Sequence, residues 1–306
     1  MTKDRISVLL GANINFKDEI KTVIAKDCEA IGLYRTEFEF FRDGKQKEED
    51  ILVEDYSSLL SKAHMLPINF RTIDIGLRDG LTNGMNADSG IRGLRFCLEN
   101  RDIFRTQLRA IYRASPHGHA RIVLPFVSTL DELSAGMDVI ADVRRRLTRS
   151  GIPFDESVPV GVMIETPSAA YICDMMAPQV DFFCLGTNDL IQYYLAIDRT
   201  DRSSLHLYSP FHPAVLRLLR HVRELVAPTG KSIVVCGELA ADPMAVAVLL
   251  GLGFTALSVN LGAYSKIKRM IRSVSITDLR EMIEDLMKMK NHSKIEEHVR
   301  SVLADR

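Results

Sequence analysis

Short apolar runs rich in branched and aromatic residues alternate along the chain with longer segments whose apolar residues recur every three or four positions. The short runs are typical of buried β-strands and the longer segments of amphipathic helices. Eight runs predict strands, at residues 7–14, 30–35, 69–74, 120–127, 158–165, 182–188, 232–238 and 256–260. Because most of these runs are apolar almost throughout, they indicate a parallel sheet whose outer face is covered by helices.

The clearest predicted helix begins after Thr129. Its apolar positions follow three-to-four spacing at Leu133, Met137, Ile140 and Leu147. Thr129 and Glu132 have the spacing of a capping box, which marks a helix start. Eight strand-helix units predict an α/β chain folded as a (β/α)₈ TIM barrel, which needs about 250 residues. An open doubly wound sheet is the alternative. We expect a single domain over residues 1–306, with additional C-terminal helices from about 275 to 306.

The composition and net charge of the chain exclude several classes of protein. The chain has 306 residues, of which 46% are hydrophobic, so it can bury a large core. Its net charge of −1 gives no electrostatic footprint for nucleic acid or for an anionic membrane. No apolar run approaches the length of a membrane span, and the first residues lack the layout of a signal peptide, so we expect a cytoplasmic protein. The five cysteines are scattered without a Cys-x-x-Cys pair, which indicates neither a disulfide framework nor a zinc site.

Polar residues gather at the ends of the predicted strands, where a barrel of this kind builds its active site. They are Arg35, Arg71, Asp74, Glu165, Asn188, Asp189, Cys236 and Glu238. Asp74 and Glu238 could equally be structural partners of nearby arginines, and a lone cysteine is more often a small buried hydrophobe. Arg35 and Arg71 need an anionic partner if they point into a barrel mouth.

Carboxylates and arginines at one mouth together predict a metal-bound anion. Glu165 and Asp189 would present the hard oxygen ligands that Mg²⁺ prefers, and arginines bind phosphate oxygens through paired hydrogen bonds. Carboxylates alone would repel a phosphate, so a divalent cation between them makes the mixed charges compatible.

Seven segments, spread over nearly the whole chain, carry a family resemblance. They are "AIGLYRTEF" (30–38), "RTIDIG" (71–76), "IRGLRFCLENRDIFRTQLRAIYRAS" (91–115), "VPVGVMIETPSAA" (158–170), "VDFFCLGTNDLIQYYLAIDR" (180–199), "SPFHPAVLRLL" (209–219) and "VVCGELAADP", which ends at residue 243. The chain resembles the phosphoenolpyruvate-binding C-terminal domain of enzyme I of the bacterial phosphotransferase system. That domain is related to those of pyruvate phosphate dikinase and phosphoenolpyruvate synthase.

The resemblance implies a role for each matching residue. Its phosphate-binding positions correspond here to Arg35, Arg71, Asn188 and Arg199, and Arg92 corresponds to a further arginine of its substrate site. Its Mg²⁺ ligands correspond to Glu165 and Asp189, and the acid that protonates the enolpyruvate carbon corresponds to Cys236. A thiol suits that role, because its unperturbed pKa of about 8.5 leaves it mostly protonated at neutral pH. The resemblance also implies a homodimer.

The resemblance implies that the chain binds Mg²⁺-phosphoenolpyruvate and supports phosphoryl transfer to a histidine, with release of pyruvate. That histidine lies in a separate N-terminal domain of the family, in a Thr-Ser-His context that none of the eight histidines of this chain has. We therefore expect a phosphohistidine domain supplied in cis or in trans.

Two other functions stay open. One is a non-catalytic module that senses phosphoenolpyruvate or dimerises. The other is a metal-dependent pyruvate lyase or aldolase, which the set of arginines disfavours because pyruvate does not need them. Residues 76–90 depart from the family by lacking a lysine and a tryptophan, and we expect this glycine-rich loop to act as a lid.

Overall fold

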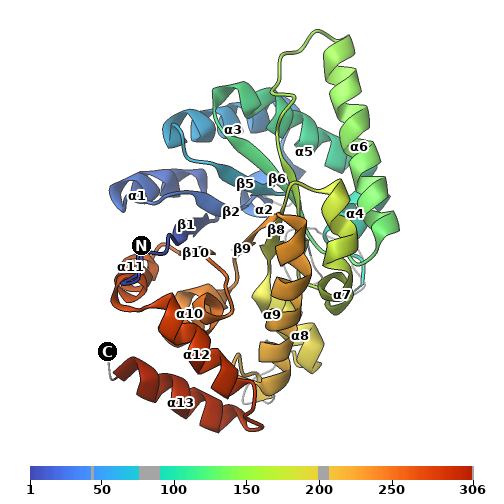
Figure 1. Ribbon diagram of the computed structural model, residues 1–306. Helices are drawn as coiled ribbons and strands as arrows, with labels where there is room; N and C mark the ends of the chain where they lie inside the picture. The colour runs from blue at the N-terminus through green and yellow to red at the C-terminus, as the bar shows by residue number, and fades with distance from the viewer. Residues whose placement is uncertain (43–44, 76–89, 199–206, 305–306) are drawn as a thin grey trace.

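Eight parallel strands close into a barrel in the computed structural model, which describes residues 1–42, 45–75, 90–198 and 207–304. The strands are β1 (Leu9–Ile14), β2 (Ile31–Arg35), β5 (Ile68–Arg71), β6 (Ala120–Leu124), β7 (Val160–Ile164), β8 (Phe182–Leu185), β9 (Ser232–Val235) and β10 (Ala256–Asn260). Each pairs in parallel with its neighbours in this order, and β1 pairs with β10 to close the barrel (Figure 1). The predicted (β/α)₈ barrel is confirmed, and each predicted strand overlaps an observed one.

Helices connect the strands and form the outer layer of the barrel (Figure 1). Those before β10 are α1 (Ile20–Ala25), α2 (Glu37–Phe40), α3 (Glu49–Ala63), α4 (Leu94–Glu99), α5 (Arg101–Ala114), α6 (Leu130–Arg149), α7 (Pro167–Met176), α8 (Thr187–Leu195), α9 (Pro213–Val226) and α10 (Pro243–Gly251). After β10 come α11 (Tyr264–Ser273), α12 (Ile276–Leu286) and α13 (His292–Ala304). The last two contact α10, so the C-terminal helices pack on the barrel's outer layer.

Helix α6 begins as its sequence predicts. The Thr129 side chain accepts a hydrogen bond from the Glu132 N–H at 3.1 Å, and the Glu132 carboxylate accepts one from the Thr129 N–H at 3.3 Å. The capping box is therefore present. Leu133, Ile140 and Leu147 are buried under the helix, as their spacing indicates.

The core has two parts. The larger lies between the strands and the surrounding helices, and the smaller fills the inside of the barrel. The inner cluster consists of Leu33, Val123, Met163, Phe182, Cys184, Val234 and Cys236. Cys184 and Cys236 thus face the barrel interior from two neighbouring strands, although they lie far apart in the sequence.

Two features differ from the expectation. A short antiparallel hairpin of β3 (Phe41–Arg42) and β4 (Lys45–Gln46) lies within the charged segment after β2, where no strand was predicted. Several strands also end earlier than predicted: β8 ends at Leu185, and Thr187 already begins α8. The residues beyond these ends belong to the loops and helix starts at the barrel mouth.

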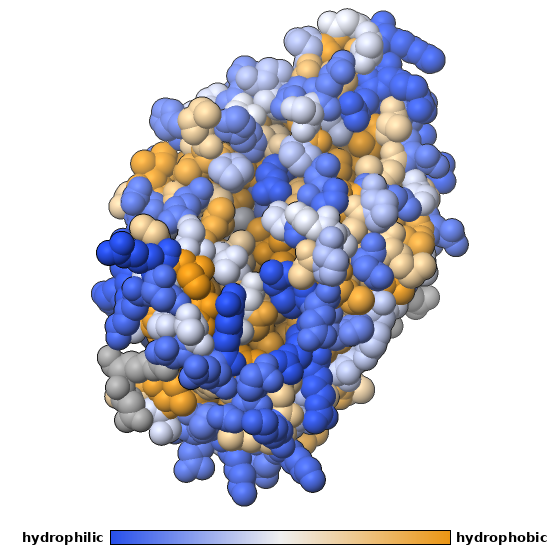
Figure 2. Space-filling model, in the orientation of Figure 1, coloured by the Kyte–Doolittle hydropathy of each residue, from blue (hydrophilic) through white to orange (hydrophobic). Residues whose placement is uncertain are grey.

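The surface view in Figure 2 shows hydrophilic side chains over much of one face, with apolar patches between them. Within the part of the chain that the structure describes, no helix combines the length and apolar character needed to cross a membrane.

Candidate functional site

A cavity of about 250 Å³ lies at the carboxyl ends of the barrel strands. Among the residues that line it are seven for which the resemblance implies a role, namely Arg35, Arg71, Arg92, Glu165, Asn188, Asp189 and Cys236, and the strand-end residues Asp74 and Glu238 line it as well. These seven residues come from the ends of β2 and β5 and from the segments that follow β5, β7, β8 and β9. Arg199 and most of the predicted lid, residues 76–89, lie outside the described residues. The seven other predicted positions meet at one pocket.

Arg71 is held between two carboxylates, which raise its pKa although burial opposes the charge. Its Nη2 is 2.8 Å from Glu37 Oε1, and its Nη1 is 2.8 Å from Asp74 Oδ2. Glu37 Oε1 also accepts a hydrogen bond from the Asp74 N–H at 2.9 Å. Burial raises the pKa of Glu37, because a desolvated carboxylate is costly even beside an arginine.

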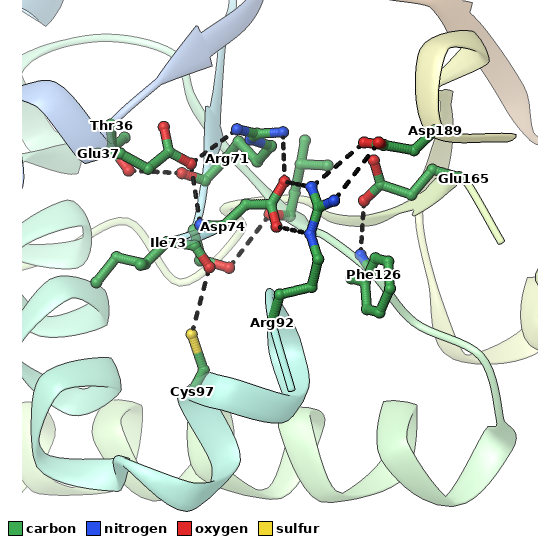
Figure 3. Close-up of polar contacts among 12 residues, drawn as sticks. Thr36, Glu37, Arg71, Ile73, Asp74, Arg92, Cys97, Phe126, Glu165 and Asp189 are labelled. Atoms are coloured by element: carbon green, nitrogen blue, oxygen red, sulfur yellow. Dashed lines mark hydrogen bonds and ion pairs between the residues drawn. The ribbon is translucent and has the colours of Figure 1, made fainter. Parts of the chain in front are cut away.

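Arg92 connects two carboxylates across the pocket (Figure 3). Its Nε and Nη2 donate to the two oxygens of Asp74 at 2.9 and 2.7 Å, and its Nη2 lies 3.3 Å from Asp189 Oδ2. Its guanidinium also lies 4.8 Å from the centre of the Phe126 ring. Burial would raise the pKa of Asp74, but Arg71 and Arg92 lower it overall. Asp74 thus partners two nearby arginines, which is one of the two alternatives that the sequence left open.

Three carboxylates form a group that fits a divalent cation. Asp74, Glu165 and Asp189 are all buried, and one oxygen from each lies within 4.8 Å of the others. Glu165 Oε1 accepts a hydrogen bond from the Phe126 N–H at 2.7 Å. Burial, followed by the charges of Asp74 and Asp189, raises the pKa of Glu165 to about 8. Crowded hard oxygens of this kind suit Mg²⁺, whose charge would relieve their repulsion.

Cys236 directly follows β9, has 2% of its surface exposed and contributes to the pocket wall. Its sulfur is 3.5 Å from the Gly32 carbonyl oxygen, and the Cys236 carbonyl accepts a hydrogen bond from Asn13 Nδ2 at 2.8 Å. Contact with Cys184 and then burial raise the pKa of the Cys236 thiol well above its usual value. The thiol therefore stays protonated at neutral pH.

Asn188 and Asp189 occupy the first turn of α8, directly after β8. Asn188 Nδ2 donates to Glu238 Oε1 at 3.1 Å, and the Glu238 N–H donates to Asn188 Oδ1 at 2.8 Å. This pair joins the ends of β8 and β9. The approach is close enough that a Cβ on Gly237 would lie 1.9 Å from Thr187 Oγ1, so position 237 accepts only glycine without a shift.

The sequence pattern assigned no role to Glu37, which lies inside the quoted segment 30–38 and lines the pocket. An acidic residue two positions after a strand-end arginine was the available signal. The contact of Arg92 with Asp189 was also missed, because no spacing along the chain indicates it.

Residues 1–276 match the family model described as PEP-utilising enzyme, PEP-binding domain. The phosphoenolpyruvate-protein phosphotransferase of Priestia megaterium is 37% identical over 306 residues, which cover 98% of this chain and 53% of that protein. The protein of the same name from Geobacillus stearothermophilus is 40% identical over 281 residues, covering 89% and 49%. The chain spans about half the length of the curated relatives it matches.

Among solved structures, a citrate lyase from Burkholderia xenovorans LB400 aligns with a TM-score of 0.54 and 16% identity, over 98% of this chain and 91% of that one. At this identity the likeness supports the barrel fold alone.

Proposed function

Because the chain belongs to the PEP-utilising enzymes and matches their PEP-binding domain, we propose that it binds Mg²⁺-phosphoenolpyruvate and supports transfer of the phosphoryl group to a histidine of another domain, releasing pyruvate. The observation that carries the proposal is one pocket that combines three clustered carboxylates, buried arginines and a protonated thiol. Relatives named phosphoenolpyruvate-protein phosphotransferase support the reaction class.

Glu165 and Asp189 would hold the Mg²⁺, whose charge offsets that of the phosphate. Asp74 belongs to the same cluster, but its two oxygens are already bonded to Arg71 and Arg92. We therefore assign Asp74 to holding the arginines and the other two carboxylates to the metal. The nearly complete burial of all three keeps their electrostatic interactions strong.

Arg35, Arg71, Arg92 and Asn188 would bind the phosphoryl group, together with Arg199. Phosphoryl transfer demands little covalent chemistry from a protein, so positioning and charge stabilisation are the main contributions of these side chains. Arg92 holds Asp74 at 2.7 and 2.9 Å but Asp189 at 3.3 Å or more. The weaker contact with Asp189 would give way if Asp189 held a cation, which would leave Nη1 and the second N–H of Nη2 for phosphate oxygens.

Cys236 would supply the proton that converts the enolate of pyruvate into pyruvate. In this step the S–H bond breaks, a C–H bond forms at the methylene carbon, and a thiolate remains. The raised pKa keeps the proton on sulfur until the enolate forms. The contact of Asn13 with the Cys236 carbonyl holds the backbone of the proton donor in place.

We also infer a cytoplasmic homodimer. The support is the resemblance of the sequence segments to enzyme I.

Magnesium affinity will rise with pH up to about 8. Glu165 has a raised pKa, so at neutral pH its protonated form predominates, and Mg²⁺ must displace that proton to bind. Below the pKa, affinity should gain up to about tenfold per pH unit, and the gain should level off above it. Titration calorimetry with Mg²⁺ at pH values below and above about 8 measures the slope of affinity against pH. The Glu165→Gln variant should bind weakly with little pH dependence; an equally flat profile in the unmodified chain would contradict the prediction.

The proposed function is tested by mixing the chain with phosphoenolpyruvate, Mg²⁺ and a separately purified phosphohistidine domain of a curated relative. We expect pyruvate release, followed with a coupled lactate dehydrogenase assay, and phosphorylation of the added histidine. Tight phosphoenolpyruvate binding without either product would favour the alternative of a sensing or dimerisation module. Absence of binding would refute both.

A further inference from the structure

Gln107 is a buried polar residue for which the proposed reaction has no role. It lies on α5, within the segment 91–115, and its side chain is fully buried. Its Nε2 donates to Thr36 Oγ1 at 2.7 Å, and its Oε1 accepts from the Ile73 N–H at 3.0 Å. The carboxamide thus connects the segment after β2 with the segment after β5, from the side of the surrounding helices.

Both partners of Gln107 are one residue away from the pocket. Thr36 follows Arg35, and its hydroxyl donates to the Arg71 carbonyl at 2.7 Å. Ile73 precedes Asp74, and Cys97 adds a weak contact from its sulfur to the Ile73 carbonyl at 3.7 Å. Thr36 and Ile73 are fully buried, so water does not compete for these bonds.

Glu37 completes the arrangement from the pocket side (Figure 3). One of its oxygens accepts hydrogen bonds from Arg71 Nη2 and from the Asp74 N–H. Besides the Thr72 N–H, which bonds the Val123 carbonyl at 2.9 Å, the segment 71–74 is held at the Arg71 carbonyl, the Ile73 amide and the Asp74 amide. Two of these three contacts depend directly or through Thr36 on Gln107.

We propose that Gln107 is a positioning residue for the pocket: through Thr36 and the Ile73 amide it fixes the turn 71–74, so that Arg71 and Asp74 face the ligand. The ligand in question is the phosphoenolpyruvate of the proposed function, on which this inference rests. A residue on an outer helix then sets the affinity of a ligand that it does not touch. A carboxamide that only satisfied buried polar groups would affect stability and leave affinity unchanged.

Four variants separate these roles. Gln107→Leu removes both hydrogen bonds at similar volume, and Thr36→Val removes the hydroxyl with little change of shape. Thr36→Ser keeps the hydroxyl. Ser115→Ala is the matched control, because Ser115 is a buried residue directly after α5 whose hydroxyl bonds the Tyr112 carbonyl and the Asp155 N–H instead of the pocket.

Two measurements are made on the intact chain. Hydrogen exchange at the Ile73 and Asp74 amides, without ligand, reports the order of the turn. Titration calorimetry with phosphoenolpyruvate and Mg²⁺ reports affinity. Gln107→Leu and Thr36→Val should speed exchange and weaken binding by about tenfold or more, the size seen when supporting contacts of a site are lost. Thr36→Ser should bind within about twofold of the unmodified chain, and Ser115→Ala likewise, even where its unfolding midpoint falls.

Unchanged affinity in a folded Gln107→Leu variant overturns the positioning role, whatever its stability, because that variant loses both the Thr36 and the Ile73 bonds. If Gln107→Leu does not fold, the affinities of Thr36→Val and Thr36→Ser for phosphoenolpyruvate are compared instead. Equal affinities would then contradict the positioning role. Failure of the proposed function is distinguishable from failure of the positioning role, because in that case the unmodified chain itself does not bind phosphoenolpyruvate.

Discussion

The Cys236→Ala variant will bind phosphoenolpyruvate about as tightly as the unmodified chain, but it will exchange the methyl protons of pyruvate with solvent at least about a hundredfold more slowly. An acid that protonates the enolate in one direction is the base that removes a methyl proton in the other. The thiol lines the pocket, and its raised pKa keeps it mostly protonated, so it must first release its proton to solvent before the thiolate takes one from the methyl group. Proton NMR of pyruvate in D₂O with Mg²⁺ measures the exchange without a phosphoryl acceptor.

Cys173→Ala is the matched control for this experiment. Cys173 is also fully buried, but it lies on α7, where its sulfur contacts the Ala170 carbonyl of the same helix at 3.6 Å. Its loss removes the same atoms from the core and should leave exchange unchanged. If Cys236→Ala lowered affinity and exchange together, Cys236 would be a packing residue. Normal exchange in that variant would assign the proton to another group.

The barrel itself was predictable because its signals are local. A parallel strand that is buried on both faces produces a short apolar run, and eight such runs separated by helical segments leave few alternatives. The start of α6 could be placed because Thr129 and Glu132 form their hydrogen bonds within four residues. The hairpin of β3 and β4 gave no such signal, since its strands have two residues each and lie in a charged segment.

Which residues meet at the pocket was also predictable, but their partners were not. In a closed parallel barrel, a polar residue at the carboxyl end of a strand lies at the barrel mouth. Arg92 follows no strand directly, and its bonds to Asp74 and Asp189 depend on how distant segments pack. Gln107 and Cys184 are similar cases, because their contacts cross from one strand or helix to another. The roles given to the site residues, Arg199 among them, stay predictions.

The Asp189→Asn variant will lose most of the Mg²⁺ dependence of phosphoenolpyruvate binding. Asparagine keeps the shape of the side chain but removes one of the two charges that we assign to the metal. Magnesium affinity should fall by about tenfold to a hundredfold, and more if the remaining ligand cannot hold the ion alone. Arg92 keeps its two bonds to Asp74, so the pocket should stay formed. Calorimetry with Mg²⁺ and with a chelator measures the difference.

Asp181→Asn is the control, because Asp181 lies just before the opposite end of β8 and bonds the Val160 N–H at 2.8 Å, away from the pocket. It should bind Mg²⁺ and phosphoenolpyruvate normally. If the Asp189→Asn variant bound phosphoenolpyruvate as tightly as the unmodified chain, both with and without chelator, neither carboxylate would belong to a metal site.

A second result should accompany the loss of Mg²⁺ affinity in the Asp189→Asn variant. The charge of Asp189 helps to raise the pKa of Glu165, so the residual Mg²⁺ binding of this variant should level off at a pH below about 8.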